Sequence, residues 1–410
     1  MKILQINSSE TDGGAAIAVS RLHSALLKNN AVDSWMLVKD KSNMNKNVIS
    51  LKKTKINYDY LKFFLNKVFS KLNNGKNKNL HSYSIFKSNI ITQINEIQPS
   101  LVNLNWVCDD LLSIEQINEI QFPIIWTMHD FWPFSGAEHY PLDTRFMNGY
   151  LSNNREVDDK FFDVDKWVWE RKLKYKNKIK NIICTSQWMI EKVKKSVIFK
   201  DANIFHVPCT IDINKWSPIN KVEARKKLSI PLDKDVFIFV SSNGIRDKRK
   251  NFDFIIKMLK KNFFNKKNLE IIIVGSDQKN FSFEAYKFKN FKINYQDYKL
   301  LILLYSSADL LLMPSKLEAF GQTALEAGLC NTPTIGFRET GLEDIINHKK
   351  TGYLSNNNDL EDFINGINWC LEQKKNNQFL LGDQARNYII KNFSNEVVAK
   401  KYLEVCKKII

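Results

Sequence analysis

Long apolar runs and closely spaced cysteines are both missing from this chain of 410 residues. A membrane-spanning helix needs about 18 or more uncharged apolar residues in a row, and no such stretch occurs. The six cysteines are scattered, so we expect reduced thiols in the cytoplasm rather than a compact Cys-based zinc site. Residues 1–7 are strand-like and too short for a signal peptide. These features favour a cytoplasmic protein, either free or peripheral on the inner face of the cytoplasmic membrane.

Standard phosphate-binding fingerprints are missing as well. The segment 12–16 follows the first predicted strand, but it is neither a GxGxxG motif nor a Walker loop with its lysine. Its two glycines, Gly13 and Gly14, let the backbone approach a ligand closely, and the helix start that follows favours negative charge. A plain tight turn is the alternative interpretation.

Positive charge is concentrated in two segments of a chain whose formal net charge is +17. Residues 51–90 hold nine Lys against one Asp, a net of +8, and residues 160–200 hold twelve Lys or Arg against four acidic residues, again +8. Such segments attract nucleic acid or anionic lipid, or they are a solubilising surface. Residues 51–72 also have the apolar spacing of an amphipathic basic helix, which lies at a membrane surface or packs on its own domain.

Strand and helix patterns alternate along the chain in two series. The strand segments are residues 3–7, 34–39, 101–107, 123–128, 181–185 and 204–208 in the first series, and 236–241, 269–275, 291–295, 309–314 and 332–337 in the second. This alternation predicts parallel sheets with helices on both faces. The length is too great for one core. We therefore predict an α/β protein of two doubly wound Rossmann-like domains, with parallel sheets that face a central cleft.

The domain boundary is predicted where the chain leaves the last strand of the first series. It gives an N-terminal domain at 1–208 and a C-terminal domain at 209–393. Residues 394–410 begin with a serine that is typical of a helix start, and they are predicted to form a helix that crosses back to the N-terminal domain.

Two glutamates, Glu318 and Glu326, bracket a turn at Gly321. An apolar strand at 308–314 precedes them, and a helix is predicted at 322–329. The helix start offers backbone N–H groups to an anion. A carboxylate accepts the paired hydroxyls that a sugar or ribose presents. A solvated helix with two ordinary glutamates is the alternative.

A histidine ends one of the predicted strands of the first series. His129 stands at the carboxyl edge of the sheet, where ligands bind in open parallel sheets. Asp130, Trp132 and Phe134 follow it on a loop, and aromatic rings beside polar groups suit the faces of sugars. The alternative is that His129 is a structural histidine with satisfied hydrogen bonds.

Four cations stand within five residues after the first strand of the second series: Arg246, Lys248, Arg249 and Lys250. At a strand-to-helix turn they can neutralise a diphosphate, because two unit charges about 4 Å apart interact by about 4 kcal/mol near a protein surface. A solvated run of charges is the alternative.

Together these segments resemble the retaining glycosyltransferases of family 4, which have the GT-B fold. The pair Glu318 and Glu326 is similar to the E-x7-E motif of that family. The segment 129–134 is similar to a subgroup that acts in bacterial surface polysaccharide assembly, and 250–253 is similar to the "KGF" element, with Asn251 where glycine is usual.

The resemblance implies a role for each candidate residue. The domain 209–393 binds the nucleotide sugar, and the domain 1–208 binds the acceptor. Catalytic roles fall to His129, Glu318, Lys250 and Arg246, where Arg246 is preferred over Arg249 as the phosphate ligand. The donor is bound by Gly13, Gly14, Phe320, Gly321, Gln322, Thr323 and Glu326, with Glu326 on the ribose. The acceptor lies near Asp130, Trp132 and Phe134.

The implied reaction moves a hexose from a UDP- or GDP-sugar to a glycan or an undecaprenyl-diphosphate-linked acceptor, for O-antigen, capsule or exopolysaccharide. It proceeds with retention of configuration and without a metal or other cofactor. The expected partners are the donor, the acceptor and the anionic inner membrane surface, not nucleic acid. The alternatives are a sugar-nucleotide epimerase or hydrolase of the same fold, and a non-catalytic basic nucleic-acid-binding protein.

Overall fold

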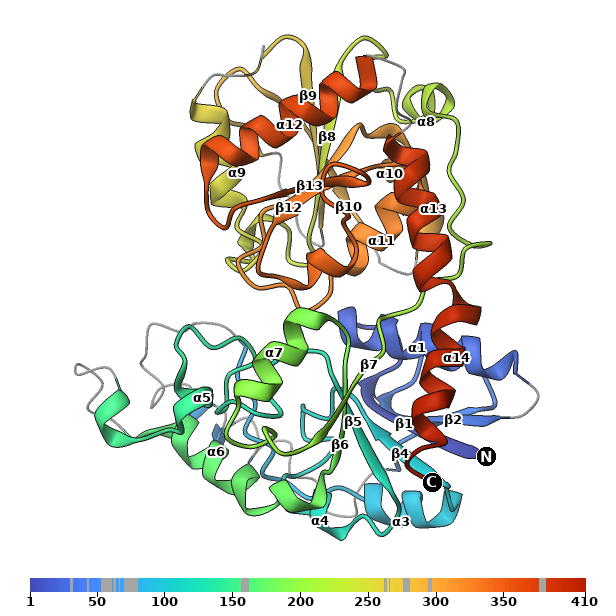
Figure 1. The fold of residues 1–410 in the computed structure, drawn as a ribbon, viewed down its shortest axis with the longest axis vertical. Coiled ribbons are helices and arrows are strands. Elements are labelled where there is room, and N and C mark those ends of the chain that lie inside the picture. Colours follow the sequence, from blue (N-terminus) through green and yellow to red (C-terminus); the bar gives the residue numbers. More distant parts are fainter. Residues whose placement is uncertain are drawn as a thin grey trace. The chain divides into compact units, whose positions relative to one another are not determined.

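A computed structural model describes the chain except for residues 30–31, 43, 53–60, 62–63, 66, 70–79, 156–161, 262–263, 265, 276–280, 294–296 and 376–380. The chain divides into two compact units (Figure 1). The first unit is Met1–Val207 with Ala399–Ile410, and the second is Pro208–Val398. Most of the basic segment 51–72 lies outside the described residues, so the amphipathic helix predicted there is not described.

The first unit is built on a seven-stranded parallel sheet with the strand order β3-β2-β1-β4-β5-β6-β7. Its strands are β1 (Lys2–Ser9), β2 (Asp33–Asp40), β3 (Val48–Ser50), β4 (Leu101–Leu104), β5 (Ile124–Met128), β6 (Asn181–Cys184) and β7 (Asn203–His206). Its helices are α1 (Gly14–Leu27), α3 (Ile90–Ile97), α4 (Gln116–Glu119), α5 (Arg145–Asn148), α6 (Val164–Lys174) and α7 (Gln187–Lys195), with short 3-10 helices η1 (Ser152–Asn154) and η2 (Lys176–Lys178).

The second unit repeats this plan with a six-stranded parallel sheet of order β10-β9-β8-β11-β12-β13. Its strands are β8 (Asp235–Val240), β9 (Leu269–Gly275), β10 (Lys287–Lys292), β11 (Leu310–Met313), β12 (Thr334–Phe337) and β13 (Gly352–Ser355). Its helices are α8 (Lys221–Lys227), α9 (Phe252–Lys260), α10 (Tyr298–Ser307), α11 (Gln322–Leu329), α12 (Leu360–Lys375) and α13 (Leu381–Phe393), with 3-10 helices η3 (Gly244–Arg246) and η4 (Gly341–Asp344). The last helix, α14 (Asn395–Cys406), carries the chain from the second unit into the first.

The predicted α/β class with two doubly wound parallel sheets is confirmed by this topology. One strand differs in position from the prediction. The strand expected at 291–295 is the edge strand β10, which begins at Lys287. Its side chains are only partly buried, so it lacks the continuous apolar run that marks central parallel strands. The short edge strand β3 has no counterpart in the prediction.

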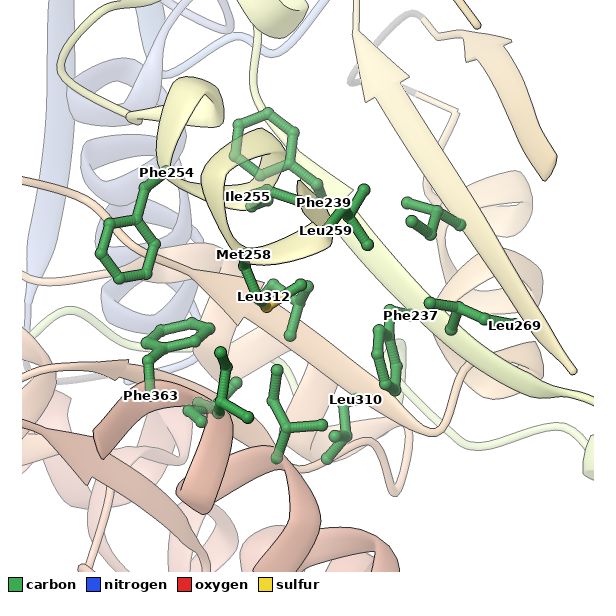
Figure 2. Packing of buried hydrophobic residues seen from close by; sticks show 14 of the residues in the cluster. Phe237, Phe239, Phe254, Ile255, Met258, Leu259, Leu269, Leu310, Leu312 and Phe363 are labelled. Carbon is green, nitrogen blue, oxygen red and sulfur yellow. The ribbon is translucent and has the colours of Figure 1, made fainter. Parts of the chain in front are cut away.

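Apart from the edge strand β10, the second sheet is buried because its strands are mostly apolar on both faces. On one face, the side chains of β8, β11 and β12 pack against α9 and α12 in a single cluster. Figure 2 shows Phe254 and Met258 of α9 beside Leu312 and Phe363. The rings of Phe254 and Phe363 meet edge to face with centroids 5.2 Å apart. This packing fixes β8 and β11 side by side, and the loops that follow these two strands carry the candidate site.

All six cysteines are buried and free of disulfides. Within the described ranges, no helix combines the length and apolarity that crossing a membrane requires.

A buried ion cluster anchors the amino end of β11. Asp309 accepts hydrogen bonds from Arg225 at 2.7 Å, from Lys221 at 2.9 Å and from the backbone N–H of Val236 at 2.9 Å, and Lys374 lies 3.1 Å away. Burial alone would raise the pKa of Asp309, but the surrounding cations lower it from 3.8 to about 2. The stability that this carboxylate contributes is therefore present above pH 3.8 and is lost as the pH falls through about 2.

We expect Asp309→Asn to destabilise the second unit by about 3–5 kcal/mol, because it leaves the buried Arg225 without its counter-charge. The matched control is Asp235→Asn, which removes a partly exposed partner of the same Lys374 and is expected to change stability by about 0–1 kcal/mol. Urea denaturation followed by circular dichroism measures both. Equal effects of the two substitutions would contradict the role given to the Asp309 cluster.

Candidate active site

The strand order of each sheet reverses at one place, between β1 and β4 in the first unit and between β8 and β11 in the second. In open parallel sheets, ligands bind outside the carboxyl ends of the strands at such a reversal. The candidate residues follow the carboxyl ends of strands β1, β5, β8 and β11. Each unit is therefore described at this edge of its own sheet.

In the second unit, an ion pair joins the two loops at the reversal. Lys250, in the loop after β8, lies with its Nζ 2.5 Å from Oε2 of Glu318, in the loop after β11. Arg249 places its Nη1 3.9 Å from the same oxygen and donates to the carbonyl of Leu317 at 3.3 Å. The backbone N–H of Lys316 donates to the carbonyl of Arg249 at 2.9 Å. Side chains and backbone thus fix the two loops to each other.

Glu318 stays ionised in this setting. Burial raises the pKa of the Glu318 carboxyl. The cations of Lys250 and Arg249 lower this pKa by more than burial raises it, so the net shift is downward. A lysine ammonium has three donors and a carboxylate has several acceptor positions. After the two side chains have paired, Lys250 therefore still has N–H donors and Glu318 still has acceptor positions for a polar ligand.

The turn before α11 requires its glycine. Gly321 caps the helix with φ +107°, a left-handed backbone that residues with a Cβ rarely adopt. A Cβ at Gly321 would also lie 2.5 Å from the side chain of Leu342. The carbonyl of Glu318 accepts from the N–H of Gly341 at 2.7 Å, so the loop rests on η4. The first turn of α11, with Gln322 and Thr323, begins at this loop and provides the N–H groups that helix starts offer to anions.

The other residues near this loop that were predicted to bind the sugar donor are buried or already hydrogen-bonded. Glu326 is buried one turn into α11, and the hydroxyl of Tyr305 donates to its Oε2 at 3.1 Å. Phe320 is buried against the ring of Phe393. Thr323 donates to the sulfur of Met313 at 3.4 Å. These contacts hold the start of α11 on its sheet.

Of the two candidate arginines, the structure brings Arg249 and not Arg246 to the ion pair. Arg246 is exposed on η3. Arg249 is half-buried, and Asp247 holds it by accepting from its backbone N–H at 3.0 Å and its Nη2 at 3.2 Å. Asp247 is absent from the predicted site. The spacing of Asp247 two residues before Arg249 is the sequence signal that could have shown which arginine is held in place.

Asn251 explains how the loop tolerates a residue other than glycine. Its φ is +62°, and asparagine is among the side chains that visit the left-handed region most readily. It caps the start of α9, one residue after Lys250.

In the first unit, His129 follows β5 and its Nε2 lies 3.0 Å from Oδ1 of Asn105. Burial lowers the pKa of His129 from 6.5 to about 4, against a smaller rise caused by Asp130. The imidazole is therefore neutral at physiological pH. Asn105 was not among the predicted site residues, although polar residues at alternate positions of an otherwise apolar strand could have indicated it.

Asp130, Trp132 and Phe134 lie in the interior. The Asp130 carboxylate accepts from Trp106 at 2.9 Å and from the backbone N–H of Trp132 at 3.0 Å, and lies 2.6 Å from Nδ1 of His139. Trp132 and Phe134 are 1% and 0% exposed. Both rings are therefore packed in the interior of the first unit. Their contact with an acceptor stays a prediction.

Gly13 and Gly14 stand where β1 passes into α1. Gly13 has φ +91°, and a Cβ placed on it would have no heavy atom within 4 Å. The requirement for glycine at this position is therefore conformational rather than steric.

The described residues contain no group of three or more His, Cys, Asp or Glu side chains placed to hold a metal ion. Independence of metal ions stays a prediction for the reaction.

Residues 220–392 match the family described as "Glycosyl transferases group 1". The matched region contains the loop of Lys250, the loop of Glu318 and helix α11. The second unit is therefore similar in sequence to this family over most of its length, and the ion pair at its sheet reversal lies inside the matched region.

Solved structures resemble the chain over its whole length. Sucrose-phosphate synthase from Thermosynechococcus elongatus aligns with a TM-score of 0.68 at 17% identity, over 100% of this chain and 98% of that one. Anabaena HepE in complex with UDP and glucose aligns with a TM-score of 0.64 at 13% identity, over 99% of both chains. At these identities the likeness shows the fold alone, and it confirms the predicted GT-B architecture.

Curated relatives match over part of their length. An uncharacterized glycosyltransferase of Methanocaldococcus jannaschii is 25% identical over 221 residues, which are 52% of this chain and 54% of the relative. An uncharacterized 41.2 kDa protein in the cps region of Klebsiella pneumoniae is 25% identical over 191 residues, which are 44% of this chain and 52% of the relative. The chain thus spans about half the length of these two relatives.

We expect Gly321→Ala to lower stability by about 1–3 kcal/mol through backbone strain, with a further loss from the contact with Leu342. The control is Gly149→Ala, which has φ +84° but no atom closer than 3.4 Å to the new Cβ. Thermal unfolding compares the two variants. A smaller effect at Gly321 than at Gly149 would show that the Glu318 loop is not held as tightly as the contacts indicate.

Proposed function

We propose that this protein is a retaining glycosyltransferase that moves a hexose from a nucleoside-diphosphate sugar to a glycan or lipid-linked acceptor. The observation that carries the proposal is the Lys250–Glu318 pair, with Arg249 beside it, at the sheet reversal and next to the start of α11. Cations, a carboxylate and a helix start in one place suit a ligand that combines a diphosphate with sugar hydroxyls.

In the proposed reaction, the bond between the anomeric carbon and the diphosphate oxygen breaks, and the oxygen of the acceptor hydroxyl forms the new bond to that carbon while its proton passes to the departing diphosphate. Negative charge grows on the departing diphosphate. Lys250 and a neighbouring arginine stabilise it without reorganisation, because the loop contacts already hold them in place. Glu318 accepts hydrogen bonds from the sugar, and Glu326 from the ribose. The proposed donor is a UDP- or GDP-sugar, in line with the HepE structure that contains UDP and glucose.

The proposed setting is bacterial surface polysaccharide assembly at the inner face of the cytoplasmic membrane. It is supported by the similarity to a protein of the Klebsiella cps region, by the segment 129–134, and by the net charge of +17. Clustered lysines attract anionic lipid, which would bring the enzyme to a lipid-linked acceptor.

We expect Lys250→Met to weaken binding of the nucleoside diphosphate by about tenfold to a hundredfold, because a charged hydrogen bond to the diphosphate is lost. Lys248→Met is the matched control, since Lys248 is in the same loop but is exposed and paired with Asp253. A thermal-shift screen with UDP, GDP and ADP identifies the nucleotide, because a ligand of the native state raises the melting temperature. Calorimetry with that nucleotide then measures both variants. Equal loss in the two variants would mean that general charge, not this site, binds the diphosphate.

We expect the sugar product to keep the anomeric configuration of the donor, and turnover to persist in excess EDTA. Proton NMR of the freshly formed product reads the configuration, and the same reaction with and without EDTA tests the metal. An inverted product, or activity abolished by EDTA and restored by a divalent cation, would contradict this mechanism. Release of free sugar without any acceptor would favour the hydrolase alternative.

A further inference from the structure

A chain of buried polar side chains crosses the first sheet and ends at His129. Gln5 of β1 and Asn103 of β4 are register partners, and both are fully buried. Nε2 of Gln5 donates to the hydroxyl of Tyr402 on α14 at 2.9 Å. Oε1 of Gln5 accepts from Nδ2 of Asn103 at 2.8 Å and from Nδ2 of Asn105 at 3.2 Å. Asn105 then meets the imidazole of His129 at 3.0 Å.

The orientation of the Asn105 amide follows from its neighbours. Its Nδ2 lies 3.2 Å from the backbone carbonyl oxygen of Asn103, and a carbonyl oxygen can only accept. That end of the side chain must therefore be the NH2 group. The other end, Oδ1, faces Nε2 of His129 and can only accept in turn, so Nε2 must carry the proton.

The second ring nitrogen of His129 is left as an acceptor. In a neutral imidazole, one nitrogen donates and the other accepts. Nδ1 of His129 has no hydrogen-bond partner among the described residues, and it is not one of the enclosed unpartnered polar atoms. Within the described part of the protein, this lone pair therefore has no partner and is not fully enclosed, where the chain leaves the carboxyl edge of the sheet.

We propose that Asn105 is a positioning residue that fixes neutral His129 as the Nε2–H tautomer, so that Nδ1 accepts a hydrogen bond from a hydroxyl group of the bound sugar. The identity of that hydroxyl donor rests on the proposed function. The tautomer itself rests only on the contacts within the first unit. Gln5 and Tyr402 belong to the same arrangement, because Gln5 accepts from the Asn105 amide and Tyr402 accepts from Gln5.

Nitrogen-15 NMR of histidine-labelled full-length protein tests the tautomer, with the His129 signals assigned by their loss in His129→Gln. We expect the unliganded protein to show Nδ1 at the frequency of an unprotonated ring nitrogen, and a proton on Nε2 that exchanges slowly with water. In Asn105→Leu the slow exchange should be lost. In the control Thr127→Val it should remain, because Thr127 donates to Asn103 at 2.9 Å and does not touch His129.

A protonated Nδ1 in the unmodified protein would overturn the proposal, and so would an Nε2 proton that exchanges as fast there as in Asn105→Leu. The first of these outcomes needs no variant, so the test holds even if Asn105→Leu does not fold.

Addition of UDP-glucose and of GDP-mannose tests the ligand contact. We expect saturation with the compound that raises the melting temperature to move the Nδ1 resonance upfield, as an accepted hydrogen bond does, and to leave Nε2 protonated. Binding without any movement of Nδ1 would overturn the ligand contact while the proposed function stands. Absence of binding by both compounds, with the Nε2–H tautomer observed, would count against the proposed function and leave the role of Asn105 intact.

Discussion

The reversal of strand order within each parallel sheet is the constraint on which the other features depend. Parallel strands place all their carboxyl ends at one edge, and at the reversal the loops of two neighbouring strands leave side by side. This brings Lys250 within 2.5 Å of Glu318, 68 residues further along the chain. In the first unit it joins the end of β1 to the loop after β4, where Ser8 donates to the carbonyl of Trp106 at 2.9 Å. The positions of Lys250 and Glu318 follow from the junction in the second unit.

Two buried carboxylates of the second unit meet their cations in different settings. Asp309, at the amino end of β11, is enclosed by two cationic side chains and a backbone N–H that hydrogen-bond to it, with a third cation close by. Glu318, at the carboxyl end of the same strand, meets its cations on loops that also present a helix start. The pKa of both carboxyls lies below its ordinary value because cations outweigh burial. The second arrangement is the one for which we propose a polar ligand.

The sequence predicts the fold well because alternating strand and helix patterns are strong, local signals. It also predicts the loops of the candidate site, since glycine, charge and strand ends mark them, and this site stays a prediction. It does not distinguish Arg249 from Arg246, because that choice depends on Asp247 and on the carbonyl of Leu317, which reaches Arg249 from a distant loop. It predicts Trp132 and Phe134 near an acceptor, and it does not reveal that both are buried. The sequence of a loop does not show whether its aromatic side chains point into the core or toward solvent.

A crystal structure of the protein with a bound nucleotide sugar tests the central claim most directly. The account predicts diphosphate oxygens within hydrogen-bond distance of Nζ of Lys250 and beside the first turn of α11, with Glu318 on a sugar hydroxyl and Glu326 on the ribose. A diphosphate bound away from the loops that follow β8 and β11, with Lys250 still paired to Glu318 alone, would contradict it.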